Sequence, residues 1–336
     1  MIRSEITEDF SPLQSEKYLE LFESQSVLNK SYFNHPIFLV ECLNAFSKTD
    51  RCFLFSVFDD DKLIGFEAFR KTKLKLRGMK LNIFVPAGFR IAEYNMPVIN
   101  SAYYSDFFQQ LSSATEKESI FYHNSTGYYT EWFKKEMKGA FVYSISSNPV
   151  LRNCNDDILK ASHKKGIVRD FKSLHKKTKV EIQHLKGNIP EKVLNDFFEL
   201  HIKRWGSQGI ESKFKNEDYR EVYHSLGKLQ ITHYGQSVLS YIKADDKMLA
   251  MHLGFIIGNS FLYQIPAFDV LHKSKSPGTI LLKSILDFIV NEKLSVFDMG
   301  YGMEEYKFRY MNEVVNYFSV ARFSNKVLNK LYKIKV

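Results

Sequence analysis

The sequence has few cysteines and no long apolar run. Its cysteines, Cys42, Cys52 and Cys154, fit neither the spacing of a zinc site nor a C-x-x-C redox pair, and their number is odd. We therefore expect reduced, partly buried thiols. The longest apolar runs, at 37–40 and 253–257, are too short to cross a bilayer, so no transmembrane segment is expected.

The N-terminal stretch also lacks the apolar core of a signal peptide. The expected location is therefore the cytoplasm, with peripheral association with a membrane as an alternative.

Several catalytic and binding motifs are missing. The chain has no G-x-S-x-G nucleophile elbow, no phosphate loop of the G-x-x-x-x-G-K-[ST] kind and no H-E-x-x-H. GYGMEE fails the dinucleotide fingerprint because Glu305 stands in the last glycine place. The ten histidines show no paired ligand spacing, so no metal is predicted.

What is present is a globular composition with localised charge. The chain has 336 residues, 44% of them hydrophobic, which favours two folded domains, expected at 1–150 and 151–336. The net charge is +9, but the basic residues concentrate in two stretches, 160–179 and 322–336. Local excess of this kind indicates particular anionic partners rather than a general property.

Apolar periodicity and turn residues predict alternating helices and strands. In the first half, helices are expected near 13–28, 36–48 and 103–117, and strands at 52–58, 63–74, 81–87, 119–124 and 140–146. In the second half, helices are expected at 157–178, 190–205, 216–228 and 276–291, and strands at 180–185, 238–243, 248–257, 260–266, 295–300 and 316–323.

The two halves resemble one another. FSVFDDDKLIGFEAF (55–69) matches SYIKADDKMLAMHLGF (240–255) as strand, acidic turn and strand. SIFYHN (119–124) and SVFDMG (295–300) each follow a predicted helix. We infer two copies of one α/β unit, although acidic hairpin turns can also recur by chance.

The stretch KSKSPGTILLKSI (273–285) has the features of an anion-binding helix start. A serine before proline suits an N-cap, and the small residues that follow leave the first amides accessible. Unpaired amides, the helix dipole and two ammonium groups could hold a phosphate; an ordinary capped helix with solvated lysines is the alternative. The candidate residues are Lys273, Lys275, Ser276, Gly278 and Thr279.

FDMGYGMEEYKFRY (297–310) places an acid at the end of an apolar strand, followed by a glycine turn. An acid there can deprotonate an amine, and a tyrosine can protonate a leaving group. A salt-bridge cluster, with Asp298 or Glu305 paired to Arg309 or Arg204, remains the alternative. The catalytic candidates are Asp298, Glu304, Glu305 and Tyr306.

A third set of candidates is expected to bind substrate. Arg204 and Trp205 end the helix in ELHIKRWGSQG (199–209), where they either hold a ligand or close the edge of a core. His252 lies in the apolar strand MLAMHLGFII, which fits a core histidine better than a catalytic base. The substrate-binding candidates are Arg204, Trp205, His252, Tyr263 and Lys307.

The second half resembles the acyltransferases of the GNAT superfamily. It is most similar to the CelD-type branch linked to cellulose and surface-polysaccharide synthesis, a distant relative of the Fem aminoacyltransferases. The matching residues are HIKRW (201–205), the strands at 238–266, FDVLHKSKSPGTILL (268–282) and FDMGYGMEEYKFRY (297–310). The resemblance implies an α/β (α+β) fold of two tandem GNAT-like units, each a mixed, mainly antiparallel sheet flanked by helices, with a degenerate first copy.

The resemblance also implies the reaction. An acyl thioester would lie between the strands at 260–266 and 295–299, with a strand amide donating to its oxygen. Asp298, Glu304 or Glu305 would take the proton of the acceptor amine, and Tyr306 or Tyr263 would protonate the sulfur. The implied acceptor is an amino sugar, linked to a nucleotide or a lipid.

The donor is less defined. The superfamily binds coenzyme A with Q/R-x-x-G-x-G/A, whereas KSKSPG (273–278) retains only the last glycine. Acyl-CoA, an acyl carrier protein or a charged tRNA could serve, and the basic helix 160–179 could dock either macromolecule. The alternatives to an amino-sugar acyltransferase are a Fem-like, tRNA-dependent aminoacyltransferase and a non-catalytic protein that binds nucleic acid or an anionic surface.

Overall fold

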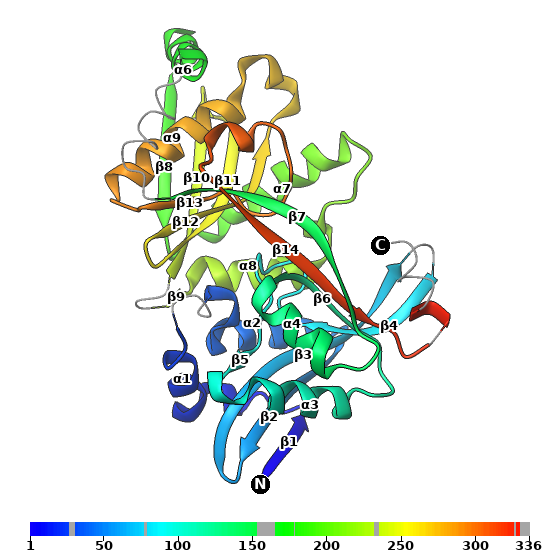
Figure 1. Ribbon diagram of the computed structural model, residues 1–336. Helices are drawn as coiled ribbons and strands as arrows, with labels where there is room; N and C mark the ends of the chain where they lie inside the picture. The colour runs from blue at the N-terminus through cyan, green and yellow to red at the C-terminus, as the bar shows by residue number, and fades with distance from the viewer. Residues whose placement is uncertain are drawn as a thin grey trace. The chain divides into compact units, whose positions relative to one another are not determined.

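Figure 1 shows the protein as a computed structural model, in which residues 1–26, 31–76, 79–152, 165–177, 179–231, 235–325 and 327–329 are described. The chain divides into two compact units. Unit 1 consists of Met1–Ser146 and Asn316–Val336, and unit 2 of Ser147–Val315. The domains expected at 1–150 and 151–336 differ from this division, because the C-terminal segment belongs to unit 1.

Unit 1 is a mainly antiparallel sheet with helices on both faces. Its strands are β1 (Ile2–Thr7), β2 (Arg51–Asp59), β3 (Lys62–Leu76), β4 (Met79–Pro86), β6 (Ile120–Thr126) and β14 (Glu313–Arg322), in that order across the sheet. The short β5 (Val98–Ile99) pairs with β3. The helices are α1 (Glu16–Glu23), α2 (Pro36–Phe46), α3 (Tyr104–Ala114) and α4 (Gly127–Glu136).

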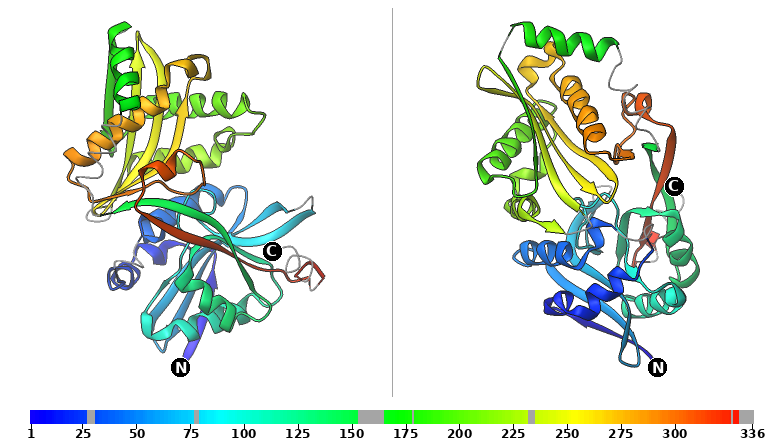
Figure 2. Two further views of the ribbon diagram at one scale, coloured as in Figure 1. Left: turned by 45° about the horizontal axis from the view of Figure 1, so that its top comes forward. Right: turned by 90° about the vertical axis from the view of Figure 1, so that its left-hand side faces the viewer.

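The central strands of unit 1 are apolar on both sides because both faces are covered. In β2, every residue from Cys52 to Phe58 is buried. Helices α1 and α2 cover one face, and α3 and α4 cover the other (Figure 2). Cys42 and Cys52 are buried free thiols, and desolvation raises the pKa of Cys52 to about 12. Cys154 lies outside the described residues.

Unit 2 has the same kind of sheet. Across it run the end of β7 (Phe141–Arg152), then β13 (Val296–Asp298), β12 (Ser260–Phe268), β11 (Lys247–Ile257), β10 (Gly235–Ala244) and β8 (Val180–Lys186). The short β9 (Gln230–Ile231) pairs with β10. The helices are α6 (Lys165–Lys177), α7 (Glu191–Gly206), α8 (Glu217–Lys228) and α9 (Pro277–Asn291). Helices α7 and α8 cover one face, and α9 covers the other (Figure 2).

The two units share one order of elements. Each has a strand, two helices, an antiparallel meander of three strands, a helix and a further strand. That further strand is parallel to the last strand of the meander in both: β6 to β4 in unit 1, and β13 to β12 in unit 2. The expected fold class of two tandem GNAT-like units is confirmed.

Strands β6 and β13 each have a second neighbour in the sheet. In neither unit does this neighbour come from the segment of chain that follows the strand. The segment after β6 forms β7, whose residues Val150–Arg152 pair antiparallel with β13 of unit 2. The strand that pairs with β6 of unit 1 is β14, from the end of the chain. The C-terminal segment therefore completes the sheet of unit 1, a connection that the sequence analysis did not predict.

Most expected helices and strands are present within a few residues of their predicted ends. Those missed include β1 and α4, together with the two-residue strands β5 and β9. Of the predicted basic helix, α6 begins at Lys165, and residues 160–164 and 178 lie outside the described part. Among the described helices, none combines the length and apolar character that a membrane span requires.

Candidate active site

A pocket opens in unit 2 where β12 and β13 separate. The two strands pair in parallel only through Ser260–Leu262 and Val296–Asp298, after which β12 continues to Phe268. The pocket has a volume of about 300 Å³. It is lined by Arg204 of α7, by Tyr263, Pro266 and Phe268 of β12, by Gly278, Thr279 and Leu282 of α9, and by Tyr306, Arg309 and Tyr310.

A bulge in β11 lies beside the point of separation. The register between β11 and β12 shifts between Leu253 and Phe255. A Cβ atom on Gly254 would lie 2.4 Å from the carbonyl oxygen of Leu262, so only glycine allows the two backbones to approach this closely. The bulge therefore fixes the course of β12 at the residue that precedes the pocket-lining Tyr263.

Two tyrosines share a hydrogen bond at the pocket. Tyr263 is buried, and its hydroxyl bonds to the hydroxyl of the half-buried Tyr306. The ring of His252 stacks on Tyr263 with centroids 4.0 Å apart. His252 is fully buried, and neither ring nitrogen has a partner among the described residues, so desolvation holds its pKa well below the usual value. The neutral ring supports Tyr263 from within the core.

Both tyrosines keep their protons at neutral pH. Desolvation, together with the nearby Glu304 charge, raises the pKa of Tyr306 to about 12. The pKa of Tyr263 lies well above its ordinary value, chiefly because the ring is buried. Tyr306 is thus the readier proton donor of the pair.

Arg204 brings a guanidinium group to the pocket. Its Nη1 donates to the carbonyl of Pro266, and its Cζ lies 4.4 Å from the centroid of the Phe268 ring. Its Nε is buried without a partner among the described residues. Desolvation lowers the pKa of Arg204, but the group remains a cation.

The first turn of α9 forms another wall. Ser276 occupies the N-cap with a left-handed φ of 50°, and its carbonyl accepts from the amides of Thr279 and Ile280. Its side chain makes no capping hydrogen bond, in contrast to the cap expected from the sequence. Gly278 faces Phe268, and a Cβ on it would make an ordinary 3.6 Å contact. The side chains of Lys273 and Lys275 lie outside the described residues.

Three of the predicted catalytic residues do not line the pocket. Asp298 accepts a 2.9 Å hydrogen bond from the amide of Gly300, which has a φ of 66°. Glu304 is 56% exposed and lies 3.0 Å from the ammonium of the buried Lys307. Glu305 is 90% exposed and pairs with Arg309 at 3.0 Å. Glu304 is nevertheless the acid whose charge acts on Arg204, Tyr263 and Tyr306.

The predicted substrate-binding residues are divided in the same way. Arg204 and Tyr263 line the pocket, whereas His252 and Lys307 lie in the core beside it. Lys307 donates to the carbonyl of Tyr301 at 2.8 Å. Trp205 is not among the lining residues and packs against His201, with ring centroids 5.7 Å apart.

Other pocket residues were not predicted as site residues from the sequence. These are Pro266, Phe268, Leu282, Tyr310 and Arg309, of which Arg309 was expected only as an ion-pair partner and does pair with Glu305. Arg309 and Tyr310 fall in the stretch at 297–310, but only the fold shows which side chains of that stretch face the cavity. Among the described residues, no group of three His, Cys, Asp or Glu side chains is arranged to hold a metal ion.

Comparison with known proteins relates unit 2 to a known protein family. Residues 161–308 match the family model described as "Acetyltransferase (GNAT) domain". No curated protein matches the chain in sequence. Similar solved structures include FemX, with 12% identity, 97% and 99% coverage of the two chains and a TM-score of 0.59. L-PGS from Bacillus licheniformis has 12% identity, 95% and 96% coverage and a TM-score of 0.58.

A tandem GNAT protein from the clavulanic acid biosynthesis pathway is also similar, with 9% identity, 97% and 99% coverage and a TM-score of 0.56. At these identities the structural likeness concerns the fold. The family match over residues 161–308 shows that unit 2 contains a GNAT-type acetyltransferase domain, and on this match the protein is a transferase.

Proposed function

We propose that unit 2 transfers an acyl group from a thioester donor, acyl-CoA or an acyl carrier protein, to an amine. The observation that carries this proposal is the pocket, in which Tyr263, Tyr306 and the first turn of α9 face one cavity beyond the separation of β12 and β13. The positive end of α9 favours the phosphates of such a donor. The tyrosines then lie where a leaving sulfur needs a proton.

The chemistry follows from these positions. The amine nitrogen attacks the thioester carbon, and a β12 amide beyond Leu262 donates to the oxygen that becomes negative, which contributes about 3 kcal/mol. This attack forms the C–N bond, and the C–S bond of the thioester then breaks. The amine proton goes to Glu304, and the thiolate takes its proton from Tyr306, which Tyr263 holds in place through their shared hydrogen bond. The proton held by Glu304 then returns to Tyr306 through solvent, so both groups end the cycle in their starting states. Asp298 and Glu305 are weaker candidates for the base, since of the three acids, none of which lines the pocket, only Glu304 acts electrostatically on both tyrosines.

The acceptor in this proposal is an amino sugar, linked to a nucleotide or a lipid, used in surface-polysaccharide synthesis. The support is the resemblance of 268–282 and 297–310 to the CelD-type branch. An acyl-CoA donor would place the reaction in the cytoplasm or at the inner membrane surface.

Unit 1 is, in this proposal, a degenerate copy without catalytic activity. It repeats the order of elements of unit 2. Its counterpart of α9 is α3, which begins at Tyr104 and lacks the Ser-Pro-Gly start of the second copy.

A tRNA-dependent aminoacyl transfer is the second candidate. Two observations favour it: the similarity to FemX over 97% of this chain, and the cations exposed along α6, which are Lys165, Arg169, Lys172 and Lys176. In this case the basic helix would contact the tRNA, and activity would fall steeply with salt. A non-catalytic protein would use the same helix for binding and would show no turnover.

A binding experiment tests the donor. Thermal unfolding is followed with acetyl-CoA, and a ligand present at 100 times its dissociation constant should add about 2.7 kcal/mol of stability. Thiol release with a nucleotide-linked amino sugar as acceptor then reports transfer. A protein that ignores acetyl-CoA but acylates an amine from charged tRNA would establish the second candidate instead.

A further inference from the structure

Arg204 is a partly buried cation without a carboxylate partner. Its guanidinium donates to the Pro266 carbonyl and lies over the ring of Phe268, and it is 5.7 Å from the ring centroid of Trp205. No ion pair joins it to an acid of the described residues. Taking a guanidinium out of water without a counter-charge costs stability, so such a group is retained where a ligand provides the charge.

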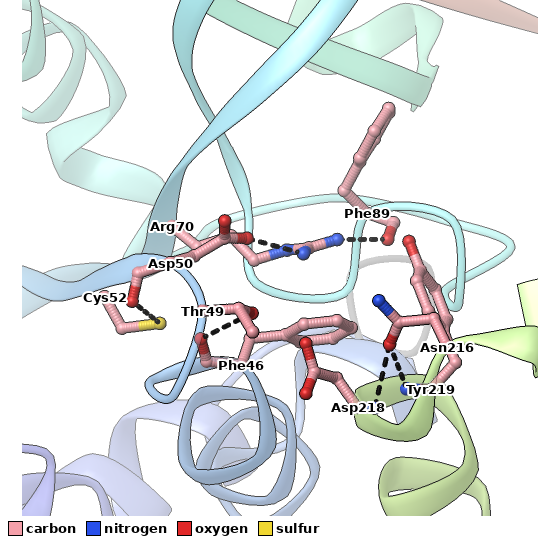
Figure 3. Close-up of polar contacts among 9 residues, drawn as sticks. All are labelled: Phe46, Thr49, Asp50, Cys52, Arg70, Phe89, Asn216, Asp218 and Tyr219. Atoms are coloured by element: carbon pink, nitrogen blue, oxygen red, sulfur yellow. Dashed lines mark hydrogen bonds and ion pairs between the residues drawn. The ribbon is translucent and has the colours of Figure 1, made fainter.

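Two other buried arginines place both terminal nitrogens of the guanidinium against protein acceptors, although each, like Arg204, keeps a buried Nε without a partner among the described residues. In unit 1, Arg70 is 4% exposed and lies 2.8 Å from the carboxylate of Asp50 and 2.9 Å from the carbonyl of Phe89 (Figure 3). Arg322 is 5% exposed and donates to the hydroxyl of Thr115 at 2.6 Å and to the carbonyls of Ser112 and Thr115 at the end of α3. Arg204 differs from both because it lines the candidate active-site pocket, whereas Arg322 lines a different cavity, in unit 1.

The charged side chains that line the cavity have one sign, although the charge of Glu304, which is outside the lining, also acts on Arg204. The charged side chains among its lining residues are those of Arg204 and Arg309, and no acid is among them. Arg309 already pairs with Glu305, so Arg204 is the cation available to a ligand. An anionic group is favoured here, and a second ammonium group is disfavoured.

The position of Arg204 assigns it to the acceptor. Helix α7, which carries Arg204, covers the face of the unit 2 sheet opposite to α9 (Figure 2). The start of α9 lines the same pocket from the other face, and the proposed donor places its phosphates there. A ligand anion at Arg204 therefore belongs to the second substrate.

We propose that the acyl acceptor carries a carboxylate or phosphate group close to its reacting amine, and that Arg204 binds this group. This inference rests on the proposed function, since it assumes a thioester donor at α9. It identifies the acceptor as an anionic amine, rather than a neutral amino sugar or a diamine. A bidentate guanidinium–anion contact is worth about a 10- to 100-fold difference in affinity.

The test compares small amines that differ in the group beside the nitrogen. Calorimetric titrations use β-alanine for the carboxylate, O-phosphoethanolamine for the phosphate, ethanolamine as the neutral amine and ethylenediamine as the dication, each with coenzyme A present. We expect one of the two anionic probes to bind at least tenfold more tightly than ethanolamine, and the better one identifies the anion. Ethylenediamine should bind most weakly.

Variants attribute the preference to the arginine. Arg204→Gln should abolish the preference for anionic probes. Arg204→Lys should retain part of this preference, because lysine keeps the positive charge but lacks the planar guanidinium that can donate two hydrogen bonds to one anion. Lys203→Gln is the matched control, since it removes one positive charge from the same helix at an exposed residue outside the pocket. Melting curves establish that each variant is folded; if Arg204→Gln is not, Arg204→Lys decides.

The inference is overturned if neither anionic probe binds more tightly than ethanolamine at 10 mM, or if the preference is undiminished in the folded Arg204 variant. Acetyl-CoA binding is measured separately in the same proteins. A protein that binds acetyl-CoA but shows no anion preference loses only this inference. One that prefers anions through Arg204 yet ignores acetyl-CoA loses the proposed donor instead.

Discussion

At the scale of single residues, the pocket depends on two tyrosines with unequal surroundings. Tyr263 is enclosed between the ring of His252 and the core, whereas Tyr306 is open to the cavity. Because burial opposes a phenolate at both positions, each hydroxyl can supply a proton without being ionised beforehand. This is the state that a general acid for a leaving thiolate requires.

Replacement of Tyr306 by phenylalanine tests this role. We expect turnover to fall about 100-fold or more, because the positioned proton donor is lost while the ring that lines the pocket is kept. The affinity for acetyl-CoA should stay within about threefold of the original. Thiol release and calorimetry measure the two quantities, and unchanged turnover would remove Tyr306 from the mechanism.

A buried acid in unit 1 has a different consequence. Glu67 is 3% exposed, accepts the amide of Ala68 at 3.0 Å, and lies within 3.4 Å of the Tyr122 hydroxyl. Desolvation raises its pKa to about 8. Since the folded pKa exceeds the unfolded one, its contribution to stability is fully present below about pH 4 and is lost as the pH rises toward 8.

The variant Glu67→Gln should therefore gain stability relative to the original protein as the pH increases. Between about pH 5 and 8 the difference in unfolding free energy should grow by up to about 1.4 kcal/mol per pH unit. Urea unfolding at pH 5, 7 and 9 measures it. Glu20→Gln, at an exposed residue of α1, is the control and should show no such trend. A difference that is constant with pH contradicts the assignment.

Residue roles were harder to predict than residue locations. The sequence places Asp298 at a strand end followed by glycines, a pattern that suits both a catalytic base and a turn. In the fold its carboxylate accepts the amide of Gly300, which is the turn. Nothing in the sequence distinguishes the two, because the direction of a strand-end side chain depends on neighbours that are distant in sequence.

At the scale of elements, the bulge at Gly254 fixes the geometry of the pocket wall. Gly254→Ala would place a methyl group 2.4 Å from the Leu262 carbonyl, so β11 or β12 must move. We expect a loss of about 1–3 kcal/mol in unfolding free energy and a weaker affinity for acetyl-CoA. Gly278→Ala is the control, because its methyl group finds 3.6 Å of space at Phe268 and should leave stability unchanged or higher. Equal melting temperatures for the two variants would show that the bulge tolerates a side chain.

The meander strands were predictable because their signals are local. Apolar runs bounded by acidic turns mark β2, β3, β10 and β11 in the sequence itself. The missed strand β1 is short and has no buried residue, so it shows little apolar signal. The missed helix α4 is rich in aromatic residues, which are poor helix formers by propensity, and it is held by packing of Tyr129 and Phe133 in the core of unit 1.

At the scale of the whole molecule, the two copies were predictable and their last strands were not. NYFSVARF has the alternation of a strand, but alternation does not state which edge the strand joins. In the fold, Tyr317 and Val320 are buried in unit 1, beside β6. Arg322 of the same strand binds the carbonyl end of α3. These partners lie about 200 residues earlier in the chain, beyond the reach of local pattern.

A truncated protein tests this connection. Deletion of residues 316–336 should expose the edge of β6 and leave the end of α3 without Arg322. We expect amide exchange to accelerate in β4, β6 and α3, while β10, β11 and β12 keep their protection, since unit 2 retains all of its own residues. A shorter deletion of 330–336, which leaves β14 in place, is the control. Equal loss of protection in both units would show that they do not fold as separate bodies.

Because β14 lies near the end of the chain, the sheet of unit 1 can be completed only late in translation. Strand β6 emerges early, yet the strand that covers it is made roughly 200 residues later, which is about 10 to 40 s at ordinary rates of synthesis. The half of the protein that is translated first must therefore finish folding last, and in the interval β6 presents an unpaired edge to which other nascent chains, or a chaperone, can bind.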